Sequence, residues 1–279
     1  EEALAMLKSP DLVQQILKDM ENLGYMGEEN NKLVGYLATV SRFLELPLGV
    51  LIVSRSGAGK SALQNVISEL VPPEDLIRLT RLTGQSLFYI GKHALTHKFL
   101  SIDEEGGMVE ALYSLRNLLS AQYLSTCSTT TDPKTGLMRS KTSESFGPSG
   151  LILGTTAAES MDFETRSRFV ILTVDETTKQ TMRILEAQRN NLTLEGQIKK
   201  KEREAIKKRH HNLQRLLRPM LVVYPAKYKL TYPGHNLMMR REQGKYLGII
   251  NSIALLHQHQ REIKKERIQN AVDRIQGKE

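Results

Sequence analysis

The sequence contains little cysteine and no long apolar run. One cysteine, Cys127, among 279 residues excludes an internal disulfide framework and an all-cysteine metal site, and a reducing, cytoplasmic compartment is expected. No apolar stretch approaches the roughly 18 residues that span a bilayer. No basic and apolar secretory leader precedes the first helix, and we expect the chain to be a segment of a longer protein. A membrane protein, a secreted mini-domain and a fibrous protein are therefore not expected.

Positive charge is unevenly distributed in an otherwise ordinary globular composition. Apolar residues make up 40% and charged residues 25%, and the length suits one large domain or a domain with a smaller partner. The net charge is +8, but residues 197–218 alone contain nine Lys or Arg and two Glu. Their spacing predicts a helix. Its charges form either a solvated face or a surface for nucleic-acid phosphates, and charge alone does not decide between the two.

Apolar patterning predicts an α/β fold with a parallel sheet. Short apolar runs alternate with helical periodicity from residue 48 to residue 174, which is typical of parallel strands covered on both faces. Ser- and Thr-rich segments on either side of a turn predict an inserted β-hairpin. We expect an N-terminal helical segment at 1–46, a core at 47–176 with the hairpin at 123–145, and a helical segment at 177–279. The expected strands are 48–53, 76–80, 98–104, 151–155 and 169–174, and the expected helices are 9–24 with Ser9 as N-cap, 28–44, 62–70 and 108–119, with a non-helical interruption at 222–233.

Residues 54–61, Ser-Arg-Ser-Gly-Ala-Gly-Lys-Ser, predict a phosphate-binding loop. They lie between a buried strand and a helix, as such a loop requires, and only the first glycine of the usual pattern is replaced, by Ser54. Small residues let backbone N–H groups surround a phosphate at the positive end of a helix. Lys60 adds a charge for the β- and γ-phosphates, and Ser61 offers a hydroxyl to Mg²⁺. ATP and Mg²⁺ are the expected cofactors, and the expected binding residues are Ser56, Gly57, Ala58, Gly59, Lys60, Ser61 and Ala62.

Two acidic residues at the end of the 98–104 strand supply the second half of this site. Asp103 is suited to hold Mg²⁺ through water opposite Ser61. Glu104 is suited to activate the attacking water as a general base. The phosphate loop and this pair together predict hydrolysis of a nucleoside triphosphate.

Two later motifs narrow the class of ATPase. Leu153-Gly-Thr-Thr156 ends a strand with two hydroxyl side chains, and Thr165-Arg-Ser-Arg-Phe169 precedes the last strand. With the phosphate loop and the Asp-Glu pair, the Ser-Arg-Phe segment resembles the minichromosome-maintenance-type (MCM-like) AAA+ helicases. The resemblance implies an AAA+ P-loop NTPase fold, a parallel sheet sandwiched by helices. It makes Thr155 or Thr156 the sensor 1 residue that positions water. Arg168, with Arg166 as a candidate helper, becomes an arginine finger for a neighbouring subunit's ATP site.

The hairpin and the C-terminal segment extend the resemblance. These helicases carry a hairpin at this place that projects into the pore of their ring, which implies DNA contacts for Lys134, Arg139 and Lys141. Residues 238–261 resemble the helical lid of primase–helicases from bacterial mobile elements and phages. Arg240 or Arg241 is then the sensor 2 arginine, and primase or zinc-binding domains belong to the full-length chain. His257 and His259 have no third ligand at a suitable spacing and are not expected to bind metal.

The resemblance implies an ATP-driven DNA helicase that acts as a homo-oligomeric, hexameric ring on single-stranded or forked DNA. An alternative is an ATP-switched loader or initiator that binds DNA without unwinding it. A transcription-activating AAA+ protein fits less well, because no Gly-Ala-Phe-Thr-Gly-Ala-like loop follows the phosphate-loop helix. Three departures from the replicative pattern favour a divergent bacterial or mobile-element relative: Ser54, threonine at sensor 1, and Val170 after Ser-Arg-Phe.

Overall fold

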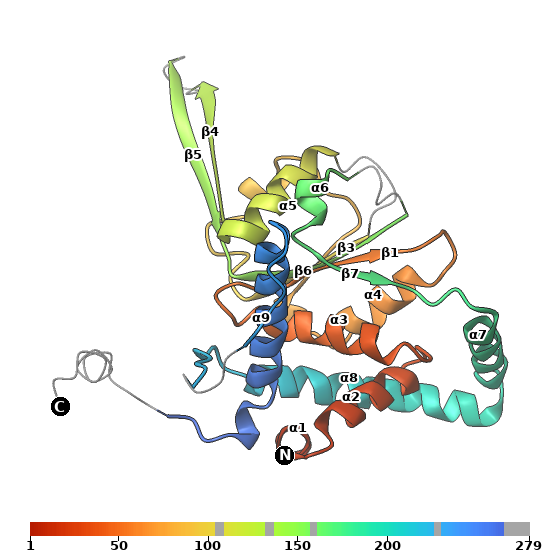
Figure 1. Ribbon diagram of the computed structural model, residues 1–279. Coiled ribbons are helices and arrows are strands. Elements are labelled where there is room, and N and C mark those ends of the chain that lie inside the picture. Colours follow the sequence, from red (N-terminus) through yellow and green to blue (C-terminus); the bar gives the residue numbers. More distant parts are fainter. Residues whose placement is uncertain (104–108, 132–136, 157–160, 226–229, 265–279) are drawn as a thin grey trace, which may run out of the picture.

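The core of the fold is a five-stranded parallel β-sheet (Figure 1). The computed structural model describes residues 1–103, 109–131, 137–156, 161–225 and 230–264. The strands lie in the order β2-β3-β6-β1-β7 and all neighbours are parallel, which confirms the predicted α/β fold. Each predicted strand of the sheet is present, as β1 (Gly49–Val53), β2 (Leu76–Leu79), β3 (Lys98–Asp103), β6 (Ser149–Thr155) and β7 (Val170–Thr173).

Alternating side chains of the sheet build two apolar layers, one on each face. Val50 and Ile52 of β1 join the layer that contains α3 (Glu29–Ser41) and α4 (Lys60–Ser68). Leu51, between them, joins the layer that contains α5 (Val109–Ala121). All three side chains are buried, because a parallel strand covered on both faces exposes neither set. The sheet is therefore flanked by helices, and the short helix α6 (Phe163–Arg166) lies beside α5 and leads into β7.

The inserted hairpin is a separate antiparallel sheet that projects away from the body (Figure 1). Its strands are β4 (Tyr123–Thr131) and β5 (Met138–Phe146), which confirms the predicted hairpin. The turn at 132–136, with Lys134, lies outside the described residues. Ser128 pairs with Lys141 and Thr130 pairs with Arg139. Because residues two apart share a face, these four lie together on what we call the basic face of the hairpin.

Helices from both ends of the chain pack together. One apolar cluster contains residues from Ala3 to Leu256. After the last helix, Gln260 donates to the carbonyl oxygens of Leu7 at 2.9 Å and Ser9 at 2.8 Å. No helix in the described ranges is long and apolar enough to cross a membrane. The terminal elements are α1 (Glu2–Lys8), α2 (Leu12–Asn22), α7 (Thr178–Asn190), α8 (Leu194–Leu216), α9 (Met239–Leu256) and the short turn η4 (Gln258–Gln260).

Two predicted boundaries are wrong. Ser9 ends α1 and does not cap α2, whose N-cap is Asp11. The Ser9 hydroxyl instead accepts the Asp11 N–H at 3.2 Å and closes a tight turn between the two helices. The C-terminal interruption is also longer than predicted, since α8 ends at Leu216 and α9 begins at Met239. Pro219 explains the earlier end of α8, because proline lacks the N–H that a helix interior needs and restricts the residue before it.

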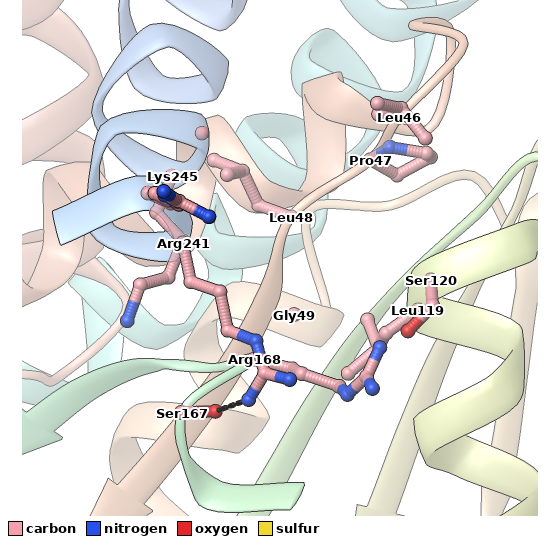
Figure 2. Close-up of a pocket in the computed structure, with 12 residues that line it drawn as sticks. Leu46, Pro47, Leu48, Gly49, Leu119, Ser120, Ser167, Arg168, Arg241 and Lys245 are labelled. Atoms are coloured by element: carbon pink, nitrogen blue, oxygen red, sulfur yellow. Dashed lines mark hydrogen bonds between the residues drawn. The ribbon is translucent and has the colours of Figure 1, made fainter. Parts of the chain in front are cut away.

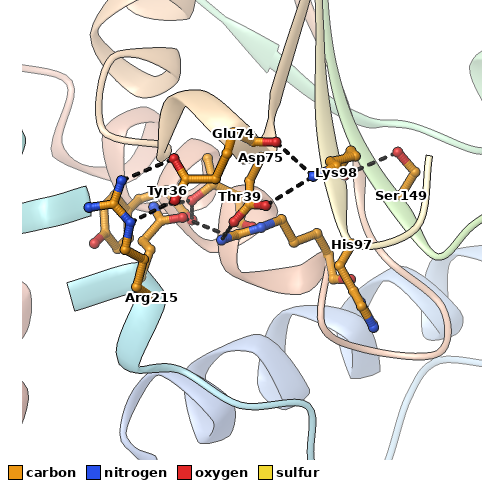
Figure 3. Close-up of polar contacts among 10 residues, drawn as sticks. Tyr36, Thr39, Glu74, Asp75, His97, Lys98, Ser149 and Arg215 are labelled. Atoms are coloured by element: carbon orange, nitrogen blue, oxygen red, sulfur yellow. Dashed lines mark hydrogen bonds and ion pairs between the residues drawn. The ribbon is translucent and has the colours of Figure 1, made fainter. Parts of the chain in front are cut away.

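Ion pairs hold α8 to the rest of the protein. Arg215 donates to Glu74 at 2.6 Å, just after the end of α4 in the turn η1 (Pro73–Asp75) (Figure 3). The adjacent Asp75 accepts from Arg42 at 3.1 Å and from Lys98 at 3.3 Å. Arg42 is completely buried, and a buried guanidinium needs such a carboxylate. Part of the basic segment 197–218 is therefore paired with an acidic residue of the same chain.

A second polar cluster surrounds Asp19 of α2. Arg209 donates to both Asp19 oxygens, at 2.8 and 2.7 Å, and His210 Nε2 lies 2.9 Å from one of them. His210 Nδ1 lies 3.0 Å from the Tyr36 hydroxyl. Burial lowers the pKa of His210, and a neutral ring satisfies both contacts by donating to Asp19 and accepting from Tyr36. Burial opposes ionisation of Asp19, but hydrogen bonds from His210 and Arg209 hold its pKa below the ordinary value.

We expect Asp19→Asn to lower the free energy of unfolding by about 3 kcal/mol, because Arg209 and His210 then lose their carboxylate. Urea unfolding measures the loss. A carboxylate with a depressed pKa stabilises the fold above its unfolded-state pKa, so the difference between variant and parent shrinks as the pH falls through the folded-state pKa of Asp19. Glu195→Gln breaks an exposed ion pair with Lys199 and leaves the midpoint unchanged. Equal midpoints for Asp19→Asn and the parent contradict the structural role of this cluster.

Candidate functional site

The loop between β1 and α4 has backbone conformations that favour glycine. The φ angle is +81° at Gly57 and +105° at Gly59. A Cβ at Gly57 would meet no atom within 4 Å, and at Gly59 the nearest is Val174 at 3.9 Å, so conformation and not crowding selects glycine. Gly59 is the N-cap of α4, and no side chain caps this helix end in the described structure. The first N–H groups of α4 are therefore available to an external acceptor.

Lys60 lies folded over this loop. Its Nζ donates to the carbonyl oxygens of Ser54 at 2.9 Å and Arg55 at 2.7 Å. A phosphate offers charged acceptors, which form stronger hydrogen bonds than neutral carbonyls. Ser61 and Ala62 are exposed in the first turn of α4. The predicted binding residues from Ser56 onward thus form one continuous surface at the carboxyl end of β1.

Ser54, which replaces the usual glycine, has a defined structural role. Its hydroxyl donates to the Val53 carbonyl oxygen and accepts the Val174 N–H at 2.9 Å. The side chain therefore ties the end of β1 to the segment that follows β7. This departure from the usual pattern strengthens the base of the loop and leaves the two glycines in place.

Asp103 is held beside the phosphate-loop helix. Gln64 of α4, which is almost fully buried, donates to Asp103 at 2.8 Å and to the Ser101 hydroxyl at 3.0 Å. A Cβ at Gly154 would come within 2.9 Å of the Gln64 side chain, so β6 also closes on this point. The structure therefore brings Asp103 to the same end of the sheet as Lys60, the end where the parallel strands have their carboxyl termini. Glu104, the predicted general base, lies outside the described residues.

Thr155 and Thr156 end β6 next to the loop. Thr155 is in register with Val53, the last residue of β1, and Thr156 follows it on the surface. The connection that leaves β1 runs to β2 at one edge of the sheet, and the connection that leaves β6 runs to β7 at the other edge. Neighbouring strands whose connections diverge form a topological switch point, where open α/β sheets bind ligands. The choice between the two threonines stays open.

Glu176 is an additional residue beside the phosphate loop, and it was not predicted from the sequence. It lies two residues before α7, and its carboxylate accepts the Arg55 N–H at 3.1 Å. The Arg55 side chain lies 3.6 Å from the same carboxylate. A loop N–H group of the kind that contacts phosphate is therefore already paired with an anionic group.

Arg168, Arg240 and Arg241 lie at the other end of β1. They line a cavity of about 290 Å³ together with Gly49, the first residue of that strand (Figure 2). Four steps along a strand cover roughly 13 Å, so Gly49 and the start of the phosphate loop are well separated. The structure therefore sorts the predicted catalytic residues into two groups, with Lys60 at one end and the arginines at the other.

The arginine group contains an unsatisfied donor. Arg168 Nη2 donates to Glu164 at 2.8 Å, but its Nε is buried and has no hydrogen-bond partner among the residues described. Arg42, Gln122 and Arg209 also have one buried donor without a partner, so this atom alone does not identify a ligand site. Arg241 Nη1 donates to the Ser167 hydroxyl at 2.6 Å (Figure 2), whereas Arg240 lines the same cavity. This cavity is suited to an anion.

The two histidines near the C-terminus contact backbone. His257 hydrogen-bonds to the Ile253 carbonyl oxygen and His259 to that of Leu216. The described part of the chain contains no group of three His, Cys, Asp or Glu side chains that could hold a metal ion.

A scan against protein-family models finds no match to this chain, and a search of curated proteins finds none either.

Proposed function

We propose that this chain is the ATP-hydrolysing motor of a ring-forming DNA helicase, with an AAA+ fold of the MCM-like type. The observation that carries the proposal is the separation of two complementary groups along β1. Lys60 marks a site for a triphosphate at one end, and Arg168 lines an arginine-rich cavity at the other. One rigid strand cannot bring its own two ends together. Head-to-tail association can bring Lys60 of one copy to Arg168 of the next, and such contacts form a ring when the rotation between copies closes.

The chemistry follows from the residues at the carboxyl end of the sheet. Lys60 and the loop N–H groups bind the phosphates, and Thr155 or Thr156 orients the attacking water. Asp103 and Ser61 fit Mg²⁺, which prefers oxygen ligands, because Gln64 holds the carboxylate beside the helix that carries the hydroxyl. When bound, Mg²⁺ supplies charge neutralisation at the phosphates. Arg168 of the adjacent subunit stabilises the charge that develops on the transferred group.

Contacts with DNA are assigned to the basic face of the hairpin. Arg139 and Lys141 are about 7 Å apart along β5, on the same face as Ser128 and Thr130. The hairpin carries these groups away from the body (Figure 1), where copies around a ring would present them to one strand. The exposed Lys200 and Lys201 of α8 are the competing surface, because Arg209 and Arg215 of that helix already form ion pairs with Asp19 and Glu74.

Strand displacement tests the proposal against its main alternative. A helicase separates a forked duplex when ATP is hydrolysed, with single-stranded DNA as a stimulator of hydrolysis. A loader or initiator hydrolyses ATP on DNA and separates nothing. The measurement is the release of a labelled strand with ATP and with a non-hydrolysable analogue. Hydrolysis without release assigns the chain to the loader class, and absence of hydrolysis in the presence of DNA overturns the ATPase assignment.

Replacing Arg139 and Lys141 together by alanine is expected to weaken single-strand binding and to flatten its salt dependence. Each phosphate contact on a single strand contributes about 0.7 to the slope of log affinity against log salt, so the slope falls by about 1.4. Fluorescence anisotropy at several salt concentrations measures both effects. The matched control is Lys200→Ala with Lys201→Ala, which removes the same charge from α8. A slope that falls in this control and not in the hairpin variant assigns DNA binding to α8.

A further inference from the structure

Glu164 of α6 connects arginines from three separate elements. One carboxylate oxygen accepts from Arg116 of α5 at 2.9 Å. The other accepts from Arg168, before β7, at 2.8 Å. Arg241 of α9 lies 3.9 Å from that second oxygen. Segments far apart in sequence therefore meet at a single negative charge.

A second contact links Arg241 to the same turn. Ser167 accepts from Arg241 at 2.6 Å and donates through the same hydroxyl to the Glu164 carbonyl oxygen at 2.8 Å. Figure 2 shows Arg168 and Arg241 in one cavity, with Ser167 bound to Arg241. Both guanidinium groups are thus tied to Glu164, one through its carboxylate and the other mainly through its backbone.

Arg116 fixes the position of the carboxylate from the other side. Its side chain is mostly buried, and its guanidinium lies over the Tyr113 ring at 5.1 Å. The hydrogen bond from Arg168, helped by the charge of Arg116, lowers the pKa of Glu164, which stays ionised at neutral pH. Two guanidinium groups in one cavity repel each other, and an ionised carboxylate between them removes that cost. Arg168 Nη2 donates to this carboxylate, so the contact fixes the orientation of the guanidinium that lines the cavity.

We infer that Glu164 is a positioning residue that holds Arg168 and Arg241 as one preorganised pair for a single anion, the transferred phosphoryl group of a neighbouring subunit. The inference rests on the proposed function. Glu164 contacts the arginines but does not itself line their cavity, so it does not touch the reacting atoms. It acts by fixing where the cations stand before the anion arrives, and misplacement of a catalytic group by about 1 Å costs on the order of 100-fold in rate.

Mixed assemblies test this inference. Lys60→Ala subunits supply only the arginine pair, and Arg168→Ala subunits supply only the phosphate loop, so a mixture of the two contains complete interfaces. Glu164→Gln is then added to one partner at a time. In the Lys60→Ala partner, which supplies the arginine pair, Glu164→Gln is expected to lower kcat of the mixture at least about tenfold and to leave KM for ATP unchanged. In the Arg168→Ala partner it is expected to have no effect, because that partner's arginine face is already inactive.

The control variant is Glu195→Gln in the Lys60→Ala partner, which also removes a carboxylate from an i,i+4 ion pair. It is expected to leave kcat of the mixture unchanged. A Glu164→Gln effect that is absent, or equal in both partners, overturns the inference while the proposed function stands. A mixture of the two single variants without any turnover overturns the proposed function and the inference with it. If Glu164→Gln in the Lys60→Ala partner raises kcat of the mixture, Glu164 restrains the arginines, and this result also contradicts the inference.

Discussion

Arg168→Ala is expected to bind ATP as the parent chain does and to hydrolyse it about 10³- to 10⁵-fold more slowly. This is the effect of an arginine finger in other phosphoryl-transfer enzymes, where the guanidinium neutralises charge that exists only in the transition state. Arg168 lies at the opposite end of β1 from Lys60, so its loss leaves the phosphate loop of the same chain intact. A fluorescent ATP analogue measures binding, and phosphate release measures turnover.

The same variant tests the proposed assembly. A single copy contains Lys60 without an arginine from a neighbour, so turnover per chain is expected to rise with protein concentration as copies associate. Mixing Arg168→Ala with Lys60→Ala is expected to restore part of the activity, since some interfaces then pair an intact loop with an intact arginine. Turnover per chain that does not change with concentration, together with no restoration on mixing, contradicts the ring.

Lys60→Ala is expected to reduce turnover to background and ATP affinity about 10- to 100-fold. One hydrogen bond to a charged group contributes about 1.5–3 kcal/mol to binding, and the lysine contact becomes stronger as charge develops on the phosphates. The fold is expected to stay intact, because the Lys60 ammonium donates only to loop carbonyl oxygens in the described structure. Isothermal titration with ATP and a thermal unfolding scan check both statements.

Arg55→Ala is the matched control for Lys60→Ala. It removes the same charge from the same loop, but the Arg55 side chain is 89% exposed and lies beside Glu176. We expect ATP affinity to change little. An equal loss in the two variants assigns the effect to the net charge of the loop and contradicts a specific role for Lys60.

Much of the fold is predictable because its signals are local. Each buried strand is a short apolar run with its own flanking helix, and Leu151–Leu153 or Val50–Ile52 needs no distant information to be identified. The phosphate loop is also local, since its glycines, lysine and serine are consecutive. The hairpin is marked by a turn between two Ser- and Thr-rich segments. In all three cases a few neighbouring residues carry the signal.

Contacts between distant residues could not be predicted in this way. Nothing near Gln64 indicates that it holds Asp103, and nothing near Glu164 indicates that it meets Arg116 and Arg241. These pairs join residues on different elements, so they can be identified only once the order of the strands and the position of α9 are known. Glu176 carries a weak signal, as an acidic residue shortly after an apolar run that ends near the phosphate loop. The helix α1 was missed because seven residues show too little periodicity for a firm prediction.

The apolar cluster that runs from Ala3 to Leu256 determines when this protein can fold during synthesis. α3 packs against both the sheet and α9, and α8 packs against α1 and α2, so these early helices wait for partners that are synthesised about 150–200 residues later. At about 5–20 residues per second, the delay between α3 and α9 is about 10–40 s. The nascent chain therefore exposes the apolar faces of α1–α3 throughout that interval, and nascent-chain proteolysis is expected to show protection of α1–α3 only after α9 has emerged.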